Sequence, residues 1–345
     1  MIQNNAQLRD FLNQIKDESE LAIDTEFKRV DTYYPVLCLV QIASNTIAEC
    51  IDVLALDDLE PLFEKLYQPN LVWIVHSARQ DIEAMYQLSG RLPQQLFDTQ
   101  IAASLLGYPI QVSYQALTES LQDIHLEKAY TRLDWTKRPL PEGAIEYALD
   151  DVRYLIKNYQ QLREQLCRDN KLVWLEEDSK NLLQIELYQA PIEQAWQRTK
   201  GITRLGKKYQ ALGVQLCAWR EQQAQRKNKP RKWILSDEDL INYALKKQKL
   251  HPKLEQARLK LLETHPQLQT PKYQQAQHKP PSKAEKSQKA TLQKIIQEKA
   301  HQYNLAVELI ASSKSLLKYI RGDRSVLFCQ GWRYHLLQKE LKNAK

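Results

Sequence analysis

Two carboxylates stand two residues apart inside a short apolar segment, residues 21–27. A strand has a side-chain period of two, so Asp24 and Glu26 would share one face. Neighbouring carboxylates in an apolar strand are costly unless a positive charge neutralises them, and the segment contains no Lys or Arg. Oxygen ligands without His or Cys nearby favour Mg²⁺ or Mn²⁺ over zinc. The residues leave open a solvent-facing pair, or an ion pair to the two basic residues that follow.

Three further residues that could take part in catalysis or metal binding lie on segments that should be helical. Asp81 falls one to two turns into a helix expected over 79–89, directly after an apolar strand at 71–75. Open α/β sheets bind ligands at the carboxyl ends of their strands, where this helix would begin. Tyr147 and Asp151 stand four residues apart, so they would share a helix face. Taken singly, each also has an ordinary structural interpretation: a first-turn Asp favoured by the helix dipole, a core tyrosine and a surface acid.

The first half of the chain contains the elements that must position these residues. Short runs with β character predict strands at 21–27, 36–42, 47–53 and 71–75. Helical periodicity predicts helices at about 57–67, 79–89, 98–106, 113–122 and 142–168. Strands that come first and then alternate with helices indicate a mixed sheet covered by helices, an α/β architecture.

The second half has almost no strand signal. Short amphipathic segments predict helices at 206–225, 236–248, 253–263, 291–302, 305–310, 313–320 and 331–343. The segment 264–290 is rich in Pro, Gln and Lys and predicts a linker that buries little. We therefore expect two small helical units on either side of it.

The two halves carry opposite charge. Residues 1–190 contain 17 basic and 30 acidic residues, a net charge of −13, whereas residues 191–345 contain 32 and 12, a net charge of +20. Such asymmetry indicates different roles for the halves. The basic runs 226–232 and 246–249 could pair with phosphates and bind nucleic acid. The alternative is that these charges only solvate helices.

Composition excludes several classes of protein. No apolar run approaches the roughly 20 residues that span a bilayer, and the first residues lack the features of a signal peptide. The five cysteines are scattered, which predicts reduced thiols in a cytoplasmic protein without a disulfide frame or zinc site. The sequence of residues 201–208 resembles a phosphate-binding loop but has Lys208 where such a loop has Ser or Thr.

The order Asp-x-Glu, Asp and Tyr-x-x-x-Asp resembles the DEDD superfamily of 3′–5′ exonucleases, in its tyrosine branch. The surrounding segments resemble ribonuclease D from residue 1 to about residue 190. The matching segments are residues 23–27, 76–83, 97–100, 134–140 and 147–155. Two positions depart from the family pattern: Ala144 stands where Gln is usual, and Ser77 where Asn or another small polar residue is frequent. Neither departure removes an acidic residue.

The resemblance implies a ribonuclease H-like exonuclease domain that uses two divalent ions, Mg²⁺ or Mn²⁺, to hydrolyse RNA to nucleoside 5′-monophosphates. The ions would be held by Asp24, Glu26, Asp81 and Asp151. Asp24 would bridge both ions, with Glu26 and Asp151 on the side of the nucleophile and Asp81 on the side of the leaving group. The Tyr147 hydroxyl would orient the attacking water.

Four more residues are candidates for substrate binding. Phe27 could stack on the terminal base or belong to the core. Arg138 could contact a phosphate or hold its loop in place, and Arg231 and Lys232 belong to the first basic run. Asp98 is interpreted as a helix cap rather than a metal ligand.

The second half resembles the HRDC module over residues 205–249 and, more weakly, over 288–345. The expected organisation is an exonuclease domain, an HRDC domain, a linker and a second HRDC-like domain at 1–190, 200–268, 269–287 and 288–345.

The resemblance implies an enzyme that trims the 3′ ends of structured RNAs, with tRNA precursors as the expected substrates and no membrane or obligate protein partner. Two alternatives stay open: a DNA 3′–5′ exonuclease, and a nucleic-acid-binding protein with a vestigial nuclease site. A chain ending near residue 190 is expected to hydrolyse short oligonucleotides but to lose affinity for long RNA.

Overall fold

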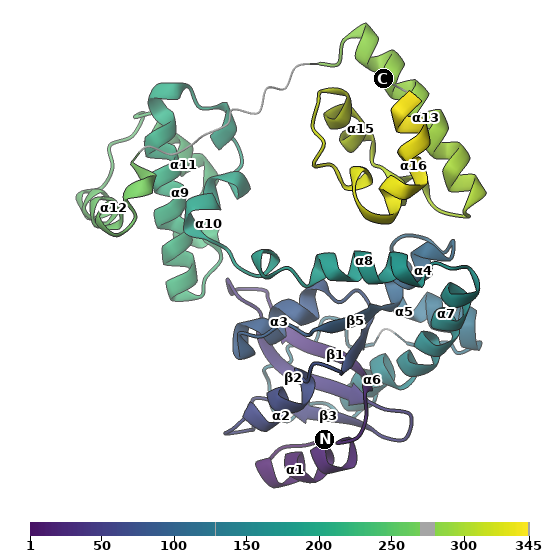
Figure 1. Ribbon diagram of the computed structural model, residues 1–345. Coiled ribbons are helices and arrows are strands. Elements are labelled where there is room, and N and C mark those ends of the chain that lie inside the picture. The colour runs from purple at the N-terminus through teal and green to yellow at the C-terminus, as the bar shows by residue number, and fades with distance from the viewer. Residues whose placement is uncertain (128, 270–279, 344–345) are drawn as a thin grey trace. The chain divides into compact units, whose positions relative to one another are not determined.

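The computed structural model describes residues 1–127, 129–269 and 280–343. They form two compact units. Unit 1 consists of residues 1–27, 37–184 and 280–345, and unit 2 of residues 28–36 and 185–279. Figure 1 labels most elements of both units. No helix of the described residues is long and apolar enough to cross a membrane.

A five-stranded sheet forms the centre of unit 1. The strands are β1 (Glu20–Lys28), β2 (Val36–Ala43), β3 (Ala48–Asp52), β4 (Val72–Val75) and β5 (Gln95–Asp98). Their order is β3-β2-β1-β4-β5, with β2 and β3 antiparallel and β1, β4 and β5 parallel. The expected mixed sheet and four of its strands are therefore confirmed. The sequence does not predict β5, because four residues with a Gln and an Asp at their ends carry little strand signal.

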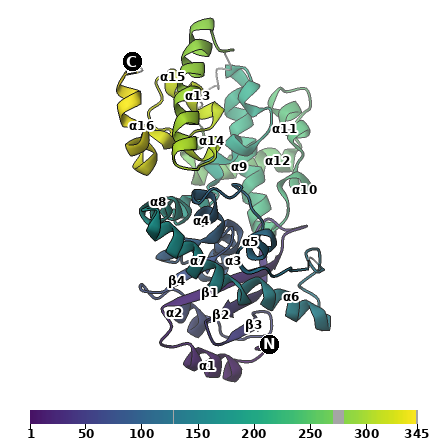
Figure 2. The same ribbon diagram turned by 90° about the vertical axis from the view of Figure 1, so that its right-hand side faces the viewer.

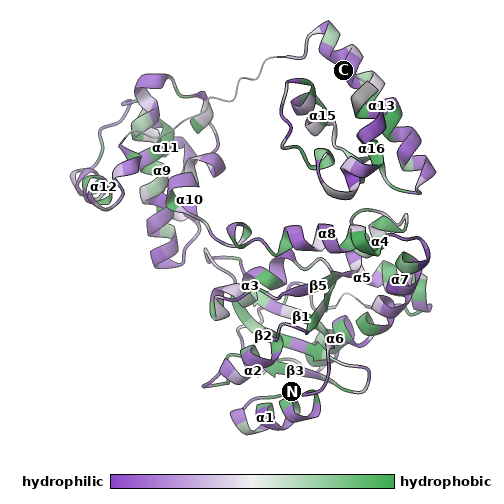
Figure 3. Ribbon diagram, viewed as in Figure 1, coloured by the Kyte–Doolittle hydropathy of each residue, from purple (hydrophilic) through white to green (hydrophobic). Residues whose placement is uncertain are grey.

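Helices cover both faces of the sheet. They are α1 (Asn5–Gln14), α2 (Glu60–Leu66), α3 (Arg79–Ser89), α4 (Thr99–Leu105), α5 (Tyr114–Gln122), α6 (Glu142–Arg153), α7 (Leu155–Arg168) and α8 (Leu172–Leu182). Figure 2 shows α1 and α2 below the sheet and α4, α7 and α8 above it. In Figure 3 the sheet is largely hydrophobic, as a layer buried on both faces must be.

Alternate residues of the central strands point to different helices. Trp73 is buried and its indole Nε1 donates to the carbonyl of Leu66 at 2.6 Å, at the end of α2. Its neighbour Ile74 packs instead in the core that includes residues of α4, α5 and α7. Helices expected over 57–67, 79–89, 98–106 and 113–122 are confirmed within a few residues. The stretch 142–168 divides at Tyr154 into α6 and α7, and α1 and α8 were not expected.

The last helices of unit 1 pack against α8. They are α13 (Lys283–Gln302), α14 (Val307–Ile310), α15 (Ser313–Ile320) and α16 (Gly331–Asn343). Trp332 stacks on Trp174 with ring centroids 4.5 Å apart, and the guanidinium of Arg333 bonds both carboxylate oxygens of Asp178 at 2.5 and 3.0 Å. Trp332 and Trp174 belong to one hydrophobic cluster with residues of the sheet. Residues 280–345 are thus part of the compact unit that contains the carboxylates.

The segment expected to be a linker, 269–287, lies largely outside the described residues, which omit 270–279. Its last part is helical: α13 begins at Lys283, because Ser282 and Glu285 form a capping box at its start. The fourfold domain division stays a prediction.

The described residues of unit 2 consist of the segment 28–36, which links β1 to β2, and of helices joined by turns. It contains α9 (Lys207–Lys227), α10 (Arg231–Ile234), α11 (Asp237–Ala244) and α12 (Pro252–Thr264). Arg220 is fully buried in α9 and donates to the carboxylate of Asp237 at 2.7 Å, which joins α9 to the start of α11. Within the same unit, the side-chain oxygen of Asn228 accepts bonds from the backbone N–H groups of Tyr33 and Tyr34, both at 2.9 Å.

Candidate active site

Asp24 and Glu26 lie where β1 extends beyond its pairing with β4. β1 pairs with β4 only from Glu20 to Ala22, so the two carboxylates follow the paired part at the carboxyl ends of the parallel strands. Their side chains share a face with Ala22, which packs in the same core as Val152 of α6. The pair is therefore directed toward the helix that carries Tyr147 and Asp151.

Three of the predicted acids converge. Oxygen atoms of Asp24, Glu26 and Asp151 all lie within 4.8 Å of one another. The fourth, Asp81, comes from α3 and is 7% exposed. Its carboxylate accepts a hydrogen bond of 2.6 Å from the hydroxyl of Thr25, the residue between the first two acids. All four acids thus belong to one neighbourhood built from β1, α3 and α6.

The acids are held close enough to disfavour each other's charge. Burial, followed by repulsion from the other three acids, holds the pKa of Asp24 well above its ordinary value. Burial and then the charges of Asp151 and Asp81 raise the pKa of Glu26 to about 8. Burial is also the main cause that raises the pKa of Asp81 and of Asp151 to about 7. A divalent cation would offset this repulsion, so the donor set fits hard, oxygen-ligated ions such as Mg²⁺ or Mn²⁺.

The turn before α3 is held by Asp98. Its carboxylate accepts from the backbone N–H groups of Ser77 at 3.1 Å and Ala78 at 2.8 Å, and also from that of Gln100 at 2.8 Å, in the first turn of α4. The prediction that Asp98 caps a helix is confirmed. Ser77 has a φ of 64°, in the left-handed region, so the same carboxylate stabilises a strained turn that orients the helix carrying Asp81.

Tyr147 lies between two other aromatic rings. Trp135 is stacked at a centroid distance of 6.4 Å, and Tyr130 meets the ring edge-on at 5.9 Å. Burial and then the charges of Asp151, Glu26 and Asp24 raise the pKa of the phenol. The hydroxyl therefore stays protonated at neutral pH and can act as a hydrogen-bond donor.

The structure places the four substrate-binding candidates differently. Phe27 directly follows Glu26 and is partly exposed. The guanidinium of Arg138 bonds the carboxylate of Asp52 through two nitrogens, at 2.5 and 2.6 Å, a geometry that holds its loop against β3. Arg231 and Lys232 belong to unit 2, and Arg231 lies 3.7 Å from Glu221. The substrate roles of all four stay predictions.

Sequence reasoning missed two buried polar residues, one that bonds an acid of the cluster and one in the neighbouring strand β2. Thr25 is one, and a hydroxyl between two acids in a strand could have indicated it. Gln41 is the other: it is fully buried in β2, and neither atom of its amide has a partner among the described residues. It is paired across the sheet with Cys50, whose thiol faces the carbonyl of Ile145 in α6. The Ala144 departure from the family pattern lies on this same helix, fully buried.

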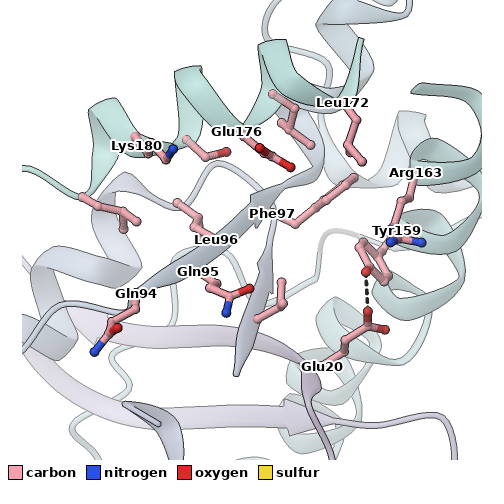
Figure 4. Close-up of a pocket in the computed structure, with 14 residues that line it drawn as sticks. Glu20, Gln94, Gln95, Leu96, Phe97, Tyr159, Arg163, Leu172, Glu176 and Lys180 are labelled. Atoms are coloured by element: carbon pink, nitrogen blue, oxygen red, sulfur yellow. Dashed lines mark hydrogen bonds between the residues drawn. The ribbon is translucent and has the colours of Figure 1, made fainter. Parts of the chain in front are cut away.

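A separate cavity of about 410 Å³ lies at the other end of the strands, beneath α8. Figure 4 shows Glu20, at the start of β1, bonded there to the hydroxyl of Tyr159 at 2.6 Å. Gln95, at the start of β5, lines it too. None of the predicted site residues lines this cavity, so it is distinct from the carboxylate cluster.

A mixed sheet with acids from the central strand and two flanking helices fits a class of enzymes that hydrolyse phosphodiesters with divalent ions. In agreement, residues 1–167 match the family described as 3′-5′ exonuclease. The ribonuclease D of Bartonella henselae is 31% identical to this chain, over 97% of the chain and 87% of that protein. The ribonuclease D of a Jannaschia species is 34% identical, over 91% of the chain and 86% of that protein.

The chain belongs to the ribonuclease D family and is a hydrolytic 3′–5′ exoribonuclease. A crystal structure of Escherichia coli RNase D, described as an exoribonuclease involved in structured RNA processing, has the same fold. Its TM-score is 0.84 at 23% identity, with 100% of this chain and 97% of that chain covered.

Proposed function

We propose that the protein trims the 3′ ends of structured RNAs, tRNA precursors in particular, by hydrolysis that depends on two divalent ions. The convergence of Asp24, Glu26 and Asp151 within 4.8 Å, with Asp81 tied to the intervening Thr25, carries this proposal. The family and its E. coli member, described as acting in structured RNA processing, support RNA as the substrate.

The four carboxylates would hold the ions, either Mg²⁺ or Mn²⁺. When bound, such ions activate a water at neutral pH and stabilise the charge on the leaving 3′-oxygen. Neighbouring residues of the chain hold these carboxylates in place. Thr25 fixes one carboxylate oxygen of Asp81, and Asp98 fixes the turn that orients its helix. The products would be nucleoside 5′-monophosphates.

Tyr147 would position the water that attacks the phosphate. Its ring is held by two aromatic contacts, and its phenol stays protonated beside the carboxylates. A protonated phenol is a poor base, so its contribution is orientation of the water through a hydrogen bond.

The helical parts would attract the RNA. Their net charge of +20 complements a phosphate backbone, whereas the half with the carboxylates is acidic. We interpret unit 2 and the last helices of unit 1 as HRDC-type modules, on the sequence resemblance described above. The cytoplasmic location stays a prediction from the sequence.

The test uses RNA and DNA of one sequence, each labelled at the 5′ end. With Mg²⁺ or Mn²⁺ the full-length protein should shorten the RNA from its 3′ end, leaving a ladder of labelled products. Asp151→Asn should lower the rate about 100-fold or more, because it removes a charged ligand. Asp150→Asn is the matched control, since Asp150 pairs with Arg153 at 3.0 Å instead.

Two results would replace the proposal. Faster loss of the DNA would favour a DNA exonuclease. Absence of hydrolysis by the wild type with either ion would favour a nucleic-acid-binding protein whose nuclease site is vestigial.

A further inference from the structure

Trp233 is exposed in a way that no other tryptophan of the chain is. Its exposed fraction is 64%, whereas Trp73, Trp135 and Trp332 are buried and the remaining three are at least partly buried. A large aromatic ring in solvent adds little to folding, because its apolar surface is not removed from water. Single exposed apolar residues are common, so exposure alone indicates no site. The surroundings of Trp233 are what distinguish it.

The ring belongs to a short, well-defined helical turn. Pro230 precedes α10, and the backbone N–H of Trp233 donates to its carbonyl at 2.9 Å. The ammonium of Lys229 lies 5.6 Å from the centre of the indole ring, within the range of a cation–π contact. The ring is therefore presented from a fixed backbone and already has a cation beside it.

Positive charge surrounds the ring. Residues 226–233 contain five Lys and Arg and no acid. Arg226, Lys227, Lys229 and Lys232 are exposed, and none forms an ion pair with a carboxylate among the described residues. Arg231 differs, because Glu221 lies 3.7 Å away. The cations without a carboxylate partner are available to an anionic ligand.

An exposed aromatic face among free cations matches one class of ligand well. Single-stranded nucleic acids offer phosphates for the cations and bases that stack on aromatic rings. A base-paired duplex offers the phosphates but not the base faces, and an acidic protein lacks stacking bases. The combination thus favours an unpaired stretch of RNA over either.

We infer that Trp233 is a base-stacking residue for single-stranded RNA and that Lys227, Lys229 and Lys232 hold the adjoining phosphates. This inference rests on the proposed function, since it takes RNA as the substrate. It adds the stacking of a base on an aromatic ring, an interaction that the positive charge of the second half does not provide. The site would select unpaired segments of a substrate by their exposed bases.

The experiment measures binding of the full-length protein to a labelled oligoadenylate in EDTA, so that no hydrolysis occurs. Trp233→Ala should weaken binding roughly five- to twentyfold, whereas Trp233→Phe, which keeps a ring, should lose much less. Leu259→Ala is the matched control, because Leu259 is a 49% exposed apolar residue of the same unit. Blunt duplex RNA should bind both Trp233 variants and the wild type alike.

The salt dependence separates stacking from charge. Trp233→Ala should leave the slope of log affinity against log salt unchanged, whereas Lys229→Ala should reduce it by about one. Equal affinity of Trp233→Ala and wild type for the oligoadenylate would overturn the inference, as would equal losses on duplex RNA. Polyglutamate serves as a model of an acidic protein. If Trp233→Ala weakened binding to polyglutamate but not to the oligoadenylate, the inference would be overturned in favour of an acidic protein ligand. Hydrolysis of a dinucleotide with Mn²⁺ tests the proposed function independently of all these results.

Discussion

At the scale of single residues, the acids and the tyrosine of the site are oriented by neighbouring side chains. Thr25 bonds the carboxylate of Asp81, and two aromatic rings hold Tyr147. The sequence offered the four acids and Tyr147 as candidates through their resemblance to an exonuclease family, and three of these acids converge in the structure. It did not identify Gln41, because an amide in a strand has no distinctive pattern until its neighbours are known, and it left out Thr25 although its place between two acids was a signal.

Tyr147→Phe should lower kcat about 100-fold, because the hydroxyl that orients the water is lost while the ring contacts remain. The measurement is steady-state hydrolysis of labelled RNA with Mn²⁺. KM should change little, since the ring and the carboxylates are retained. Tyr130→Phe is the control, because it removes a hydroxyl from the ring that meets Tyr147 edge-on. Similar losses in kcat for both variants would contradict a specific role for Tyr147.

Gln41→Met should leave the free energy of unfolding unchanged or raise it by about 1 kcal/mol. The reason is that Gln41 is fully buried and its amide has no partner among the described residues. Urea unfolding of wild type and variant measures the difference. A loss of about 2 kcal/mol or more would show that the amide is hydrogen-bonded in solution.

At the scale of elements, the site is an edge where β1, α3 and α6 meet. β1 supplies two acids because only its first residues pair with β4. α6 supplies Asp151 and Tyr147 from one face. The sequence predicted these segments well, because strong apolar periodicity marks them. It did not predict the break at Tyr154 or β5, since both depend on contacts between distant segments.

Metal-free protein should lose stability as pH rises. The pKa of Glu26 is raised to about 8 and those of Asp81 and Asp151 to about 7, above the values near 4 expected in the unfolded chain. The folded protein therefore binds more protons than the unfolded chain between about pH 4 and pH 8, and its stability falls through that window.

Mn²⁺ should accordingly raise the Tm more at pH 8 than at pH 5, because protons compete with the ion for the carboxylates. Thermal unfolding in EDTA and in Mn²⁺ at both values measures this. In Glu26→Gln the increase in Tm should be smaller, since one ligand charge is lost. The same increase in Tm at pH 5 and pH 8 would contradict the assignment of these acids to the metal site.

Asp98→Ala should destabilise the protein by about 2–4 kcal/mol, because one carboxylate caps α4 and holds the turn before α3. Activity at a temperature where the variant is folded should also fall, through misplacement of Asp81. Chemical denaturation and kcat are the two measurements. Asp123→Ala, which alters a surface turn after α5, is the comparison. A loss no greater than that of the comparison would argue against the role of Asp98.

At the scale of the whole molecule, the division into an acidic and a basic half does not coincide with the division into two structural units. Unit 1 contains the acidic residues of the sheet together with residues 280–345 from the basic half. The contacts of Trp332 with Trp174 and of Arg333 with Asp178 join them. The sequence could predict the helices of this part but not their partner, because amphipathic faces do not say what covers them.

This changes how the role of the basic half should be tested. A chain ending near residue 190 would lack Trp332 and Arg333, which contact Trp174 and Asp178, so lost activity could reflect lost folding. Arg333→Met in the full chain should cost about 3–5 kcal/mol, because it leaves a buried carboxylate unpaired. Substitution of both Arg333 and Asp178 by apolar residues should lower the free energy of unfolding less than Arg333→Met does. Equal losses from the single and the double substitution would contradict a buried ion pair.

The central claim is that four carboxylates from β1, α3 and α6 form one metal site. The most direct measurement is anomalous diffraction from a crystal of the protein soaked with Mn²⁺. We expect two Mn²⁺ peaks among Asp24, Glu26, Asp81 and Asp151. Absence of any peak there, with manganese bound elsewhere or nowhere, would contradict the claim.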